Sequence, residues 1–502
     1  MKKKILSMLL SMVLTVACFT GCGSNPSSGG ETGGAASTEI PKNPEDMYTV
    51  TMAVIGNDQE DMDLVEAEMN KILAEKVGAQ IDVITLGWGV YQQQLQLMLS
   101  GAEKLDLVPI MYNNVSTYVN SGQVLDMSDL IDQYGVNMKA ALGEDILKIA
   151  NMNGYVYGVP VEKEWYADSC LVMRKDILDK YNLDVSNVKS LADCAPIFET
   201  IHENEPDMKI IVGAKDGLIG NIYFADVLSD RFGVLDNGGA DTTIVNYHET
   251  ENLAATVHDY YEKGYIDKDM ATSTDAGTTI LKAGNAFCFA TPYKPGVAEQ
   301  ESLNTGYELV AVRINPTPAF CYTNAVAAIT WGIGQNCENP EMTMKVLDYM
   351  YGDPELMNLF NWGIEGVHYV VKDAENDVIG FPDGVDASNA KYNLNMGWEL
   401  PNQYKIHVWE GSSRKIMDAQ KEMNATANKS KALGFMFDST SVSNEIAALN
   451  NVVSEYSSSI DCGAADPTTA IPEFNEKLYA AGLQTVMDEK QKQLNEWLEN
   501  QK

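Results

Sequence analysis

Aromatic side chains stand beside amides and carboxylates at the ends of several apolar segments of this 502-residue chain. A sugar ring presents an apolar C–H face that packs on an indole or phenol ring, and amide and carboxylate groups suit its hydroxyl rim. These residue types therefore favour the binding of a carbohydrate. The candidate ligand-binding residues are Asn57, Asp58, Gln59, Trp88, Tyr91, Tyr112, Asn113, Glu164, Trp165, Asn221, Tyr293, Trp331, Trp362 and Trp398.

Trp88 is the candidate with the clearest local signal. It lies between Gly87 and Gly89, directly after the apolar segment 81–86. Glycines on both sides allow a sharp turn of the backbone and leave the indole without shielding neighbours. For Trp331 and Trp362, packing in the core remains an open alternative to ligand contact.

The common catalytic and metal-binding motifs are missing from the sequence. It lacks the phosphate-binding loop, the nucleophile elbow and the H-E-x-x-H zinc motif, and its five histidines share no ligand spacing. Asp373–Val378 begins like a calcium-binding loop, but Val378 stands where that loop requires glycine, so we interpret it as a hairpin turn. We therefore expect a binding protein without cofactor or metal, not an enzyme. A pair of acids for glycoside hydrolysis remains an alternative, since 71 acidic residues always offer some pair.

Charge and composition limit the partners of the chain. The net charge of −36 repels nucleic acid and anionic lipid headgroups, so neither is expected as a partner. An apolar fraction of 45% is typical of a globular protein. Only four arginines are present, which disfavours a ligand held by bidentate clamps on carboxylate or phosphate.

The N-terminal segment has the form of a secretory signal. Three lysines at 2–4 precede an apolar run that ends in small residues, and Gly21 before Cys22 resembles a bacterial lipobox. We predict a lipoprotein signal peptide over 1–21, and then the lipidated Cys22 with a flexible linker over 22–47. Cys18 is the rival acceptor of the lipid. The protein is expected on the extracellular face of the cell membrane, held by its lipid.

Alternating strands and helices predict an α/β fold for the body of the chain. The first elements are a strand at 48–56, a helix at 60–78, a strand at 79–86, a loop and helix at 87–101, and a strand at 105–112. Ligands bind at the carboxyl ends of such parallel strands, where Asn57, Trp88 and Tyr112 stand. A second α/β unit follows, and a cleft between the two is the expected ligand site.

The predicted organisation comprises two lobes and a C-terminal region. It consists of 48–163 as the first part of lobe 1, 164–315 as lobe 2, 316–385 as the return to lobe 1, and 386–502 as a mainly helical region that packs on the lobes. Near the C-terminus a helical stripe of apolar residues is expected to pack in the core: Phe474, Leu478, Leu483, Met487, Leu494 and Leu498.

Several stretches are similar to the family 1 extracellular solute-binding lipoproteins of ABC importers, in the branch with a C-terminal domain of unknown function. They are NGYVYGVPV, LVMRKDILDKYNLD, NWGIEGVHYVV, DASNAKYNLNMGWELPNQ and SKALGFMFDSTSVSNEIAALNNVVSEY. The resemblance implies a two-lobed type II periplasmic-binding-protein-like fold with an inter-lobe cleft. It also implies an oligosaccharide ligand and an ABC transporter permease as partner, but it transfers no ligand-binding residue. A lipid-anchored polysaccharide hydrolase or lyase remains the alternative.

Overall fold

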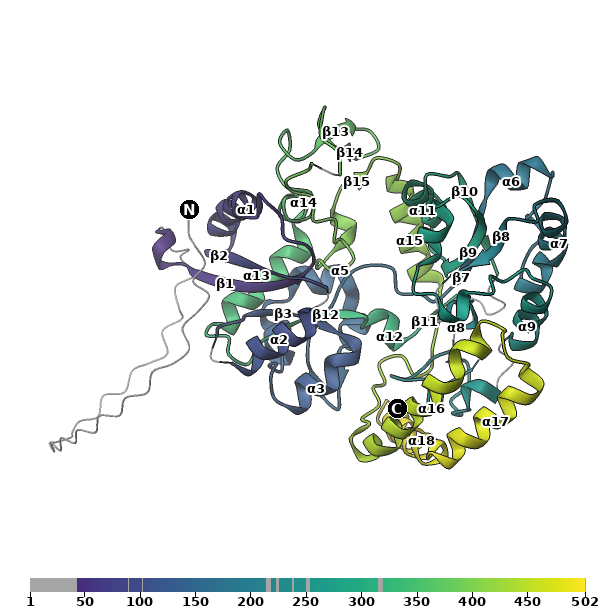
Figure 1. The fold of residues 1–502 in the computed structure, drawn as a ribbon. Helices are drawn as coiled ribbons and strands as arrows, with labels where there is room; N and C mark the ends of the chain where they lie inside the picture. Colours follow the sequence, from purple (N-terminus) through teal and green to yellow (C-terminus); the bar gives the residue numbers. More distant parts are fainter. Residues whose placement is uncertain are drawn as a thin grey trace, which may run out of the picture. The chain divides into compact units, whose positions relative to one another are not determined.

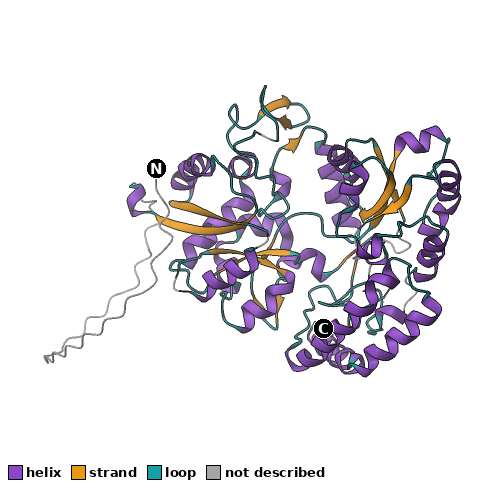
Figure 2. Cartoon of the chain, in the orientation of Figure 1, coloured by secondary structure: helices purple, strands orange, loops and turns teal. Residues whose placement is uncertain are grey.

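The computed structural model describes residues 43–501 except 89, 102, 214–217, 223–224, 237–238, 250–252, 315–318 and 388. The predicted signal peptide, Cys22, its rival Cys18 and most of the linker lie outside these residues. The described part contains two main sheets, each flanked by helices (Figures 1 and 2). No helix among the described residues is long and apolar enough to cross a membrane.

The first sheet has five strands in the order β2-β1-β3-β12-β6. Their bounds are β1 Tyr48–Ile55, β2 Ala79–Leu86, β3 Leu107–Met111, β6 Val159–Pro160 and β12 Ile329–Ile333. β1 pairs in parallel with β2 and β3, whereas β12 runs antiparallel to β3 and β6. The first three strands fall within the predicted segments, because each is a short apolar run between helix and turn signals.

Helices cover both faces of this sheet, so β1 is buried on both sides (Figure 1). Val50, Met52 and Val54 point into one core and Ala53 into the other. Such two-sided burial is typical of parallel strands. The helices of this unit are α1 Met62–Lys76, α2 Tyr91–Ser100, α3 Val115–Asn120, α4 Ser128–Tyr134, α5 Val136–Leu147, α12 Thr323–Val326, α13 Pro340–Gly352 and α14 Pro354–Trp362. A short hairpin, β4 Asn151–Met152 with β5 Tyr155–Val156, follows α5.

The second sheet has the order β10-β7-β9-β8. Its strands are β7 Ser169–Arg174, β8 Lys209–Val212, β9 Ala286–Pro292 and β10 Leu309–Arg313. All six residues of β7 are buried, since β7 lies between two antiparallel neighbours. The helices of this unit are α6 Lys175–Lys180, α7 Ala195–Asn204, α8 Ile219–Ile222, α9 Ala254–Glu262, α10 Gly277–Lys282 and α11 Val297–Thr305.

The C-terminal helices share a hydrophobic core with residues 228–244 of the second unit. Three helices contribute to this core: α16 Ser443–Asp461, α17 Pro467–Ala480 and α18 Leu483–Asn500. The preceding helix, α15 Arg414–Thr426, contributes no residue to it. The predicted apolar stripe lies in this core, with Leu498 at its partly buried margin. Lys490 of α18 is fully buried, and its Nζ donates to Asp230 Oδ1 at 2.7 Å and to the Gly233 carbonyl at 2.9 Å.

Two smaller sheets complete the described strands. β13 Val370–Asp373 pairs antiparallel with β14 Val378–Gly380, and β14 pairs with β15 Val408–Trp409. The turn between β13 and β14 confirms the predicted hairpin at 373–378. β11 Phe320–Cys321 pairs with β16 Asn428–Lys429.

Candidate functional site

Three of the candidate aromatic residues form one cluster at the end of β2. Trp88 is 48% exposed and stacks on Trp398, with ring centroids 5.7 Å apart and planes inclined by 26°. Tyr91 meets Trp88 edge-on at 6.1 Å. The N–H groups of Val90 and Tyr91 donate to the Gly87 carbonyl, so the chain turns from β2 directly into α2. The cluster offers an indole face to the solvent next to the carboxyl ends of the parallel strands.

Segment 391–399 holds Trp398 beside the end of β1. The N–H of Asn393 donates to Gln59 Oε1 at 2.8 Å, and the N–H of Asp61 donates to the Lys391 carbonyl at 3.2 Å. Of the three polar candidates after β1, Asn57 and Asp58 are exposed and Gln59 is half-buried. The structure therefore brings these three residues to the same edge of the sheet as Trp88 and Trp398.

Glu399 is a buried acid directly behind this aromatic cluster. Its Oε1 accepts the N–H of Ile55 at 2.8 Å, whereas Oε2 has no hydrogen-bond partner among the described residues. Burial raises the pKa of Glu399 to about 8, so the carboxyl is mostly protonated at neutral pH. Sequence inspection missed this residue, since nothing in its neighbourhood distinguishes a buried acid from an exposed one.

A second polar group surrounds Glu164, in the segment that leads from β6 to β7. Glu164 accepts a hydrogen bond from Gln403 Nε2 at 2.8 Å and lies 3.5 Å from Lys294 Nζ. Burial by itself would raise the pKa of Glu164, but the charges of Lys163 and Lys294 and the Gln403 amide lower it to about 2. The carboxylate therefore stays charged across the physiological range.

Two buried phenols face the same carboxylate. The hydroxyls of Tyr166 and Tyr404 have no hydrogen-bond partner in the described part of the chain. The pKa of each is raised, first by burial and then by the negative charge of Glu164. Tyr293, which directly precedes Lys294, is half-buried, and the Arg313 guanidinium lies 4.9 Å from its ring centroid. Unsatisfied hydroxyls are suited to bind a ligand or water.

One segment, residues 397–403, carries both Trp398 and Gln403, the hydrogen-bond partner of Glu164. A Cβ placed on Gly397 would lie 3.6 Å from the Cβ of Gln403, so the chain between Trp398 and Gln403 folds back on itself. Gln403, Tyr404 and Lys294 were missed from the sequence, because their contact with Glu164 joins distant parts of the chain.

Tyr112 stands at the end of β3, in the short 3₁₀ turn η2 Tyr112–Asn114. Its N–H donates to the Ala328 carbonyl at 3.2 Å, and its hydroxyl has no partner among the described residues. Burial and the neighbouring Tyr157 raise the pKa of this phenol. The side chains of Asn113 and Asn221 lie outside the described part of the structure.

Three candidate tryptophans lie in the core. Trp165, Trp331 and Trp362 are 8%, 0% and 4% exposed. Each indole N–H donates to a backbone carbonyl: those of Val161, Glu399 and His407 respectively. In this structure they pack in the core, with the polar group of each satisfied internally, so we do not propose them as ligand contacts. For Trp331 the cause is its position in β12, which lies between two neighbouring strands.

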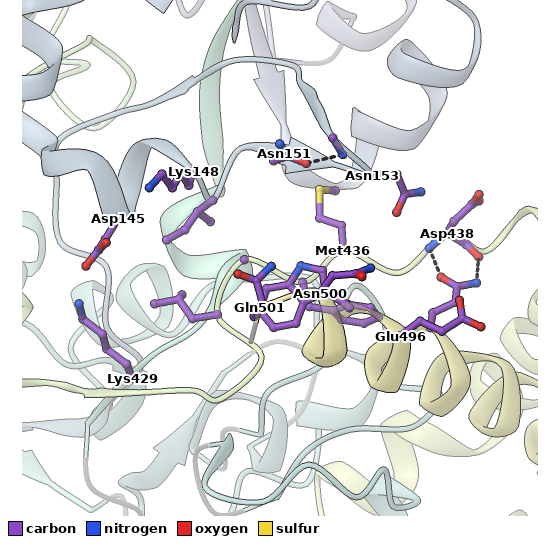
Figure 3. A pocket seen from close by; sticks show the side chains of 17 residues that line it. Asp145, Lys148, Asn151, Asn153, Lys429, Met436, Asp438, Glu496, Asn500 and Gln501 are labelled. Carbon is purple, nitrogen blue, oxygen red and sulfur yellow. Dashed lines mark hydrogen bonds between the residues drawn. The ribbon is translucent and has the colours of Figure 1, made fainter. Parts of the chain in front are cut away.

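A cavity of about 830 Å³ lies between the β4–β5 region and the C-terminal helices (Figure 3). None of the fourteen candidate residues lines it. Its lining comprises Asp145, Lys148, Ile149, Asn151, Asn153, Gly154, Lys429, Leu433, Gly434, Phe435, Met436, Asp438, Gln493, Glu496, Trp497, Asn500 and Gln501. No group of three or more His, Cys, Asp or Glu side chains in the described part could hold a metal ion.

Residues 57–356 match the family described as bacterial extracellular solute-binding protein. This chain belongs to that family. Residues 431–499 match a second family, a domain of unknown function termed DUF3502. The resemblance stated from the sequence is thus confirmed in both parts of the chain.

A curated relative of this solute-binding protein is the carbohydrate ABC transporter substrate-binding protein of Streptococcus pneumoniae serotype 4. The two are 30% identical over 464 residues, which cover 91% of this chain and 92% of the relative. The crystal structure of an N-glycan transport solute-binding protein from Streptococcus pneumoniae matches with a TM-score of 0.81 and 27% identity, over 91% of this chain and all of the other. The same streptococcal protein in complex with Man5GlcNAc matches with a TM-score of 0.69 and 28% identity, over 91% and 99% of the two chains.

These likenesses confirm the predicted two-lobed binding-protein fold with its helical C-terminal extension. They also confirm that the chain is related to solute-binding proteins and not to enzymes.

Proposed function

We propose that this chain is the receptor subunit of a carbohydrate ABC importer, which captures an oligosaccharide between its lobes and delivers it to the permease. The observation that carries the proposal is the stacked pair Trp88–Trp398, with the polar residues 57–59 at the same edge of the sheet. An exposed indole face with amides and a carboxylate beside it matches the apolar face and hydroxyl rim of a sugar. The carbohydrate ABC transporter relative supports the same ligand class.

The ligand is an oligosaccharide of the N-glycan type. Support comes from the streptococcal protein, crystallised with Man1GlcNAc and with Man5GlcNAc, which is 27% to 28% identical to this chain over about nine-tenths of its length. The polar group around Glu164 suits such a ligand, since the half-buried Glu164 carboxylate and Gln403 amide can pair with sugar hydroxyls and acetamido groups. Eleven candidates remain our proposed contacts: Asn57, Asp58, Gln59, Trp88, Tyr91, Tyr112, Asn113, Glu164, Asn221, Tyr293 and Trp398.

Binding closes the two lobes on the ligand. In support, this chain belongs to the extracellular solute-binding family, and hinge closure around a ligand is the motion of periplasmic binding proteins.

The protein is held on the extracellular face of the cell membrane by a lipid on Cys22. This proposal rests on the lysines, apolar run and Gly21-Cys22 junction of the N-terminal sequence. The linker of 22–47 gives the body the freedom to scan for ligand and to dock on the permease.

Calorimetric titration of the purified chain with Man5GlcNAc, and mass spectrometry of the recovered glycan, test the proposal. We expect saturable binding and chemically unchanged glycan. Product that accumulates in proportion to protein concentration would favour the hydrolase or lyase alternative instead. A thermal-shift screen over a glycan library extends the test, since a ligand at 100 times its Kd adds about 2.7 kcal/mol to the free energy of unfolding.

A further inference from the structure

The cavity beside the C-terminal helices has the size and polarity of a ligand site. Its volume of about 830 Å³ lies within the range of known small-ligand pockets. One wall comes from the end of α5 and the β4–β5 hairpin, and the other from residues 429–438 and the last turns of α18 (Figure 3). The candidate sugar-binding cluster around Trp88 contributes to neither wall.

The two walls belong to different structural units. Met152 of β4 and Tyr155 of β5 pack in a core of the first sheet. The wall formed by α18 is anchored to the second unit, through a shared core and through the buried ion pair of Lys490 with Asp230. Met436 bridges them, since it packs in the first unit's core although it belongs to the C-terminal domain. A ligand in this cavity therefore touches both units.

The lining offers an aromatic ring and unoccupied hydrogen-bonding groups. Trp497 is half-buried and meets Phe435 edge-on at 6.1 Å, which holds the indole in place. The side chains of Asn153, Asn500 and Gln501 make no hydrogen bond to other described residues, and all three are exposed. A fixed indole with polar side chains around it is the combination that the Trp88 cluster also presents.

The charges around the cavity indicate a neutral ligand. The lining carries two lysines, Lys148 and Lys429, and three acids, Asp145, Glu496 and Asp438. The carboxylate of Asp438 accepts a hydrogen bond from the Thr440 hydroxyl. With one acid more than lysines, the lining provides no clamp for an anion, and a neutral ligand meets no charge repulsion there.

We propose that this cavity is a second carbohydrate-binding site, in which the C-terminal domain holds outer sugar residues of a long oligosaccharide. The inference rests on the proposed function of the chain as an oligosaccharide receptor. It assigns a ligand-binding role to residues 431–499, the domain of unknown function, with Trp497 as the stacking residue and Asn500 and Gln501 as hydrogen-bonding residues.

Paired titrations of the full mature chain with Man1GlcNAc and Man5GlcNAc test the proposal. The variants are Trp497→Ala and the double variant Asn500→Ala/Gln501→Ala. For Trp497→Ala we expect the Kd for Man5GlcNAc to rise at least about tenfold, equivalent to about 1.4 kcal/mol, while the Kd for Man1GlcNAc changes less than about twofold. The double variant is expected to show the same selectivity with a rise of about three- to tenfold. Trp497→Tyr, which keeps an aromatic face, should recover most of the affinity.

Glu499→Ala is the matched control, because Glu499 is exposed in the same last turn of α18 and does not line the cavity. If Trp497→Ala unfolds α18, the double variant tests the second site in its place, because Asn500 and Gln501 are exposed and do not support the core. An equal loss of affinity for both glycans, or no loss for either, overturns the second site while the proposed function stands. A wild-type chain that binds neither glycan overturns the proposed function, and the second site with it.

Discussion

Trp88 and Trp398 stack at 5.7 Å although one follows the second strand of the chain and the other lies in a loop beyond the last strand of the same sheet. The loop is fixed by hydrogen bonds to residues after β1, so the position of Trp398 depends on backbone contacts and not on the indole pair alone. The stacked pair is thus a preformed surface, and a ligand that packs on it need not order the two side chains first.

Trp88→Ala should weaken oligosaccharide binding by about 2 kcal/mol, a roughly thirty-fold rise in Kd, which is the scale of an interface hot spot. The melting temperature of the free protein should barely change, because the Trp88 side chain is 48% exposed. Calorimetric titration and thermal melting of the variant measure the two effects. Leu97→Ala is the control: Leu97 is 65% exposed on α2, and its loss should leave affinity unchanged. Unchanged affinity with a large loss of stability would show that Trp88 is structural.

Glu399→Gln should remove a pH dependence of stability. The pKa of Glu399 is raised from 4.5 to about 8 by burial, so the folded state keeps a proton that the unfolded state has lost between these pH values. The contribution of Glu399 to the stability of the wild type is therefore full below pH 4.5 and is lost as the pH rises to about 8, by roughly 5 kcal/mol in total. The glutamine keeps the acceptor for the Ile55 N–H without a charge to bury.

Urea unfolding of both proteins at pH 5, 7 and 9 measures this difference. We expect Glu399→Gln to gain stability relative to the wild type as the pH rises, with similar values at pH 5. Glu103→Gln, at an exposed position, should follow the wild type at every pH. Parallel pH profiles for Glu399→Gln and the wild type would mean that the acid is not protonated in the folded state.

Lys490→Ala should destabilise the C-terminal helices by about 3–5 kcal/mol, because it leaves the partly buried Asp230 without its partner and opens a gap beneath α18. Lys490→Met, which fills the space without a charge, should lose less. Chemical unfolding monitored by circular dichroism provides the measurement. Lys492→Ala is the matched control on the same helix, since the Lys492 side chain is 62% exposed. A similar loss for Lys490→Ala and Lys492→Ala would argue against a stabilising role for the buried pair.

Cys22→Ala should abolish incorporation of labelled palmitate, because the thioether-linked lipid needs this thiol. The protein should then be released or remain uncleaved, which fractionation of cells reveals. Cys18→Ala is the matched control and should change neither labelling nor location. Labelling that persists in Cys22→Ala but is lost in Cys18→Ala would reverse the assignment.

Local sequence patterns predicted much of the fold, because the positions of strands, turns and helices depend largely on neighbouring residues. β1, β2 and the hairpin at 373–378 follow from apolar runs and turn residues, and the stripe on α17 and α18 follows from helical periodicity. The tryptophans show where such reasoning ends. Trp88 and Trp331 each precede a glycine, yet one is exposed and the other is buried, because strand pairing between distant segments decides their surroundings.

The sites were predictable only in part for the same reason. Trp88, Trp398 and Glu164 were found by residue type, but their partners Gln403, Tyr404 and Lys294 meet them only through long-range folding. The cavity beside α18 gave no sequence signal, since its two walls lie far apart along the chain.

The core that α16, α17 and α18 share with residues 228–244 makes the C-terminal domain inseparable from its neighbour. A chimera that exchanged only 431–499 between two relatives would set mismatched apolar surfaces against Leu228, Phe232 and Ile244. To transplant the ligand preference of one receptor to another, the C-terminal domain and the segment 226–249 would have to be exchanged together. The C-terminal domain and the segment 226–249 are thus expected to change together in evolution.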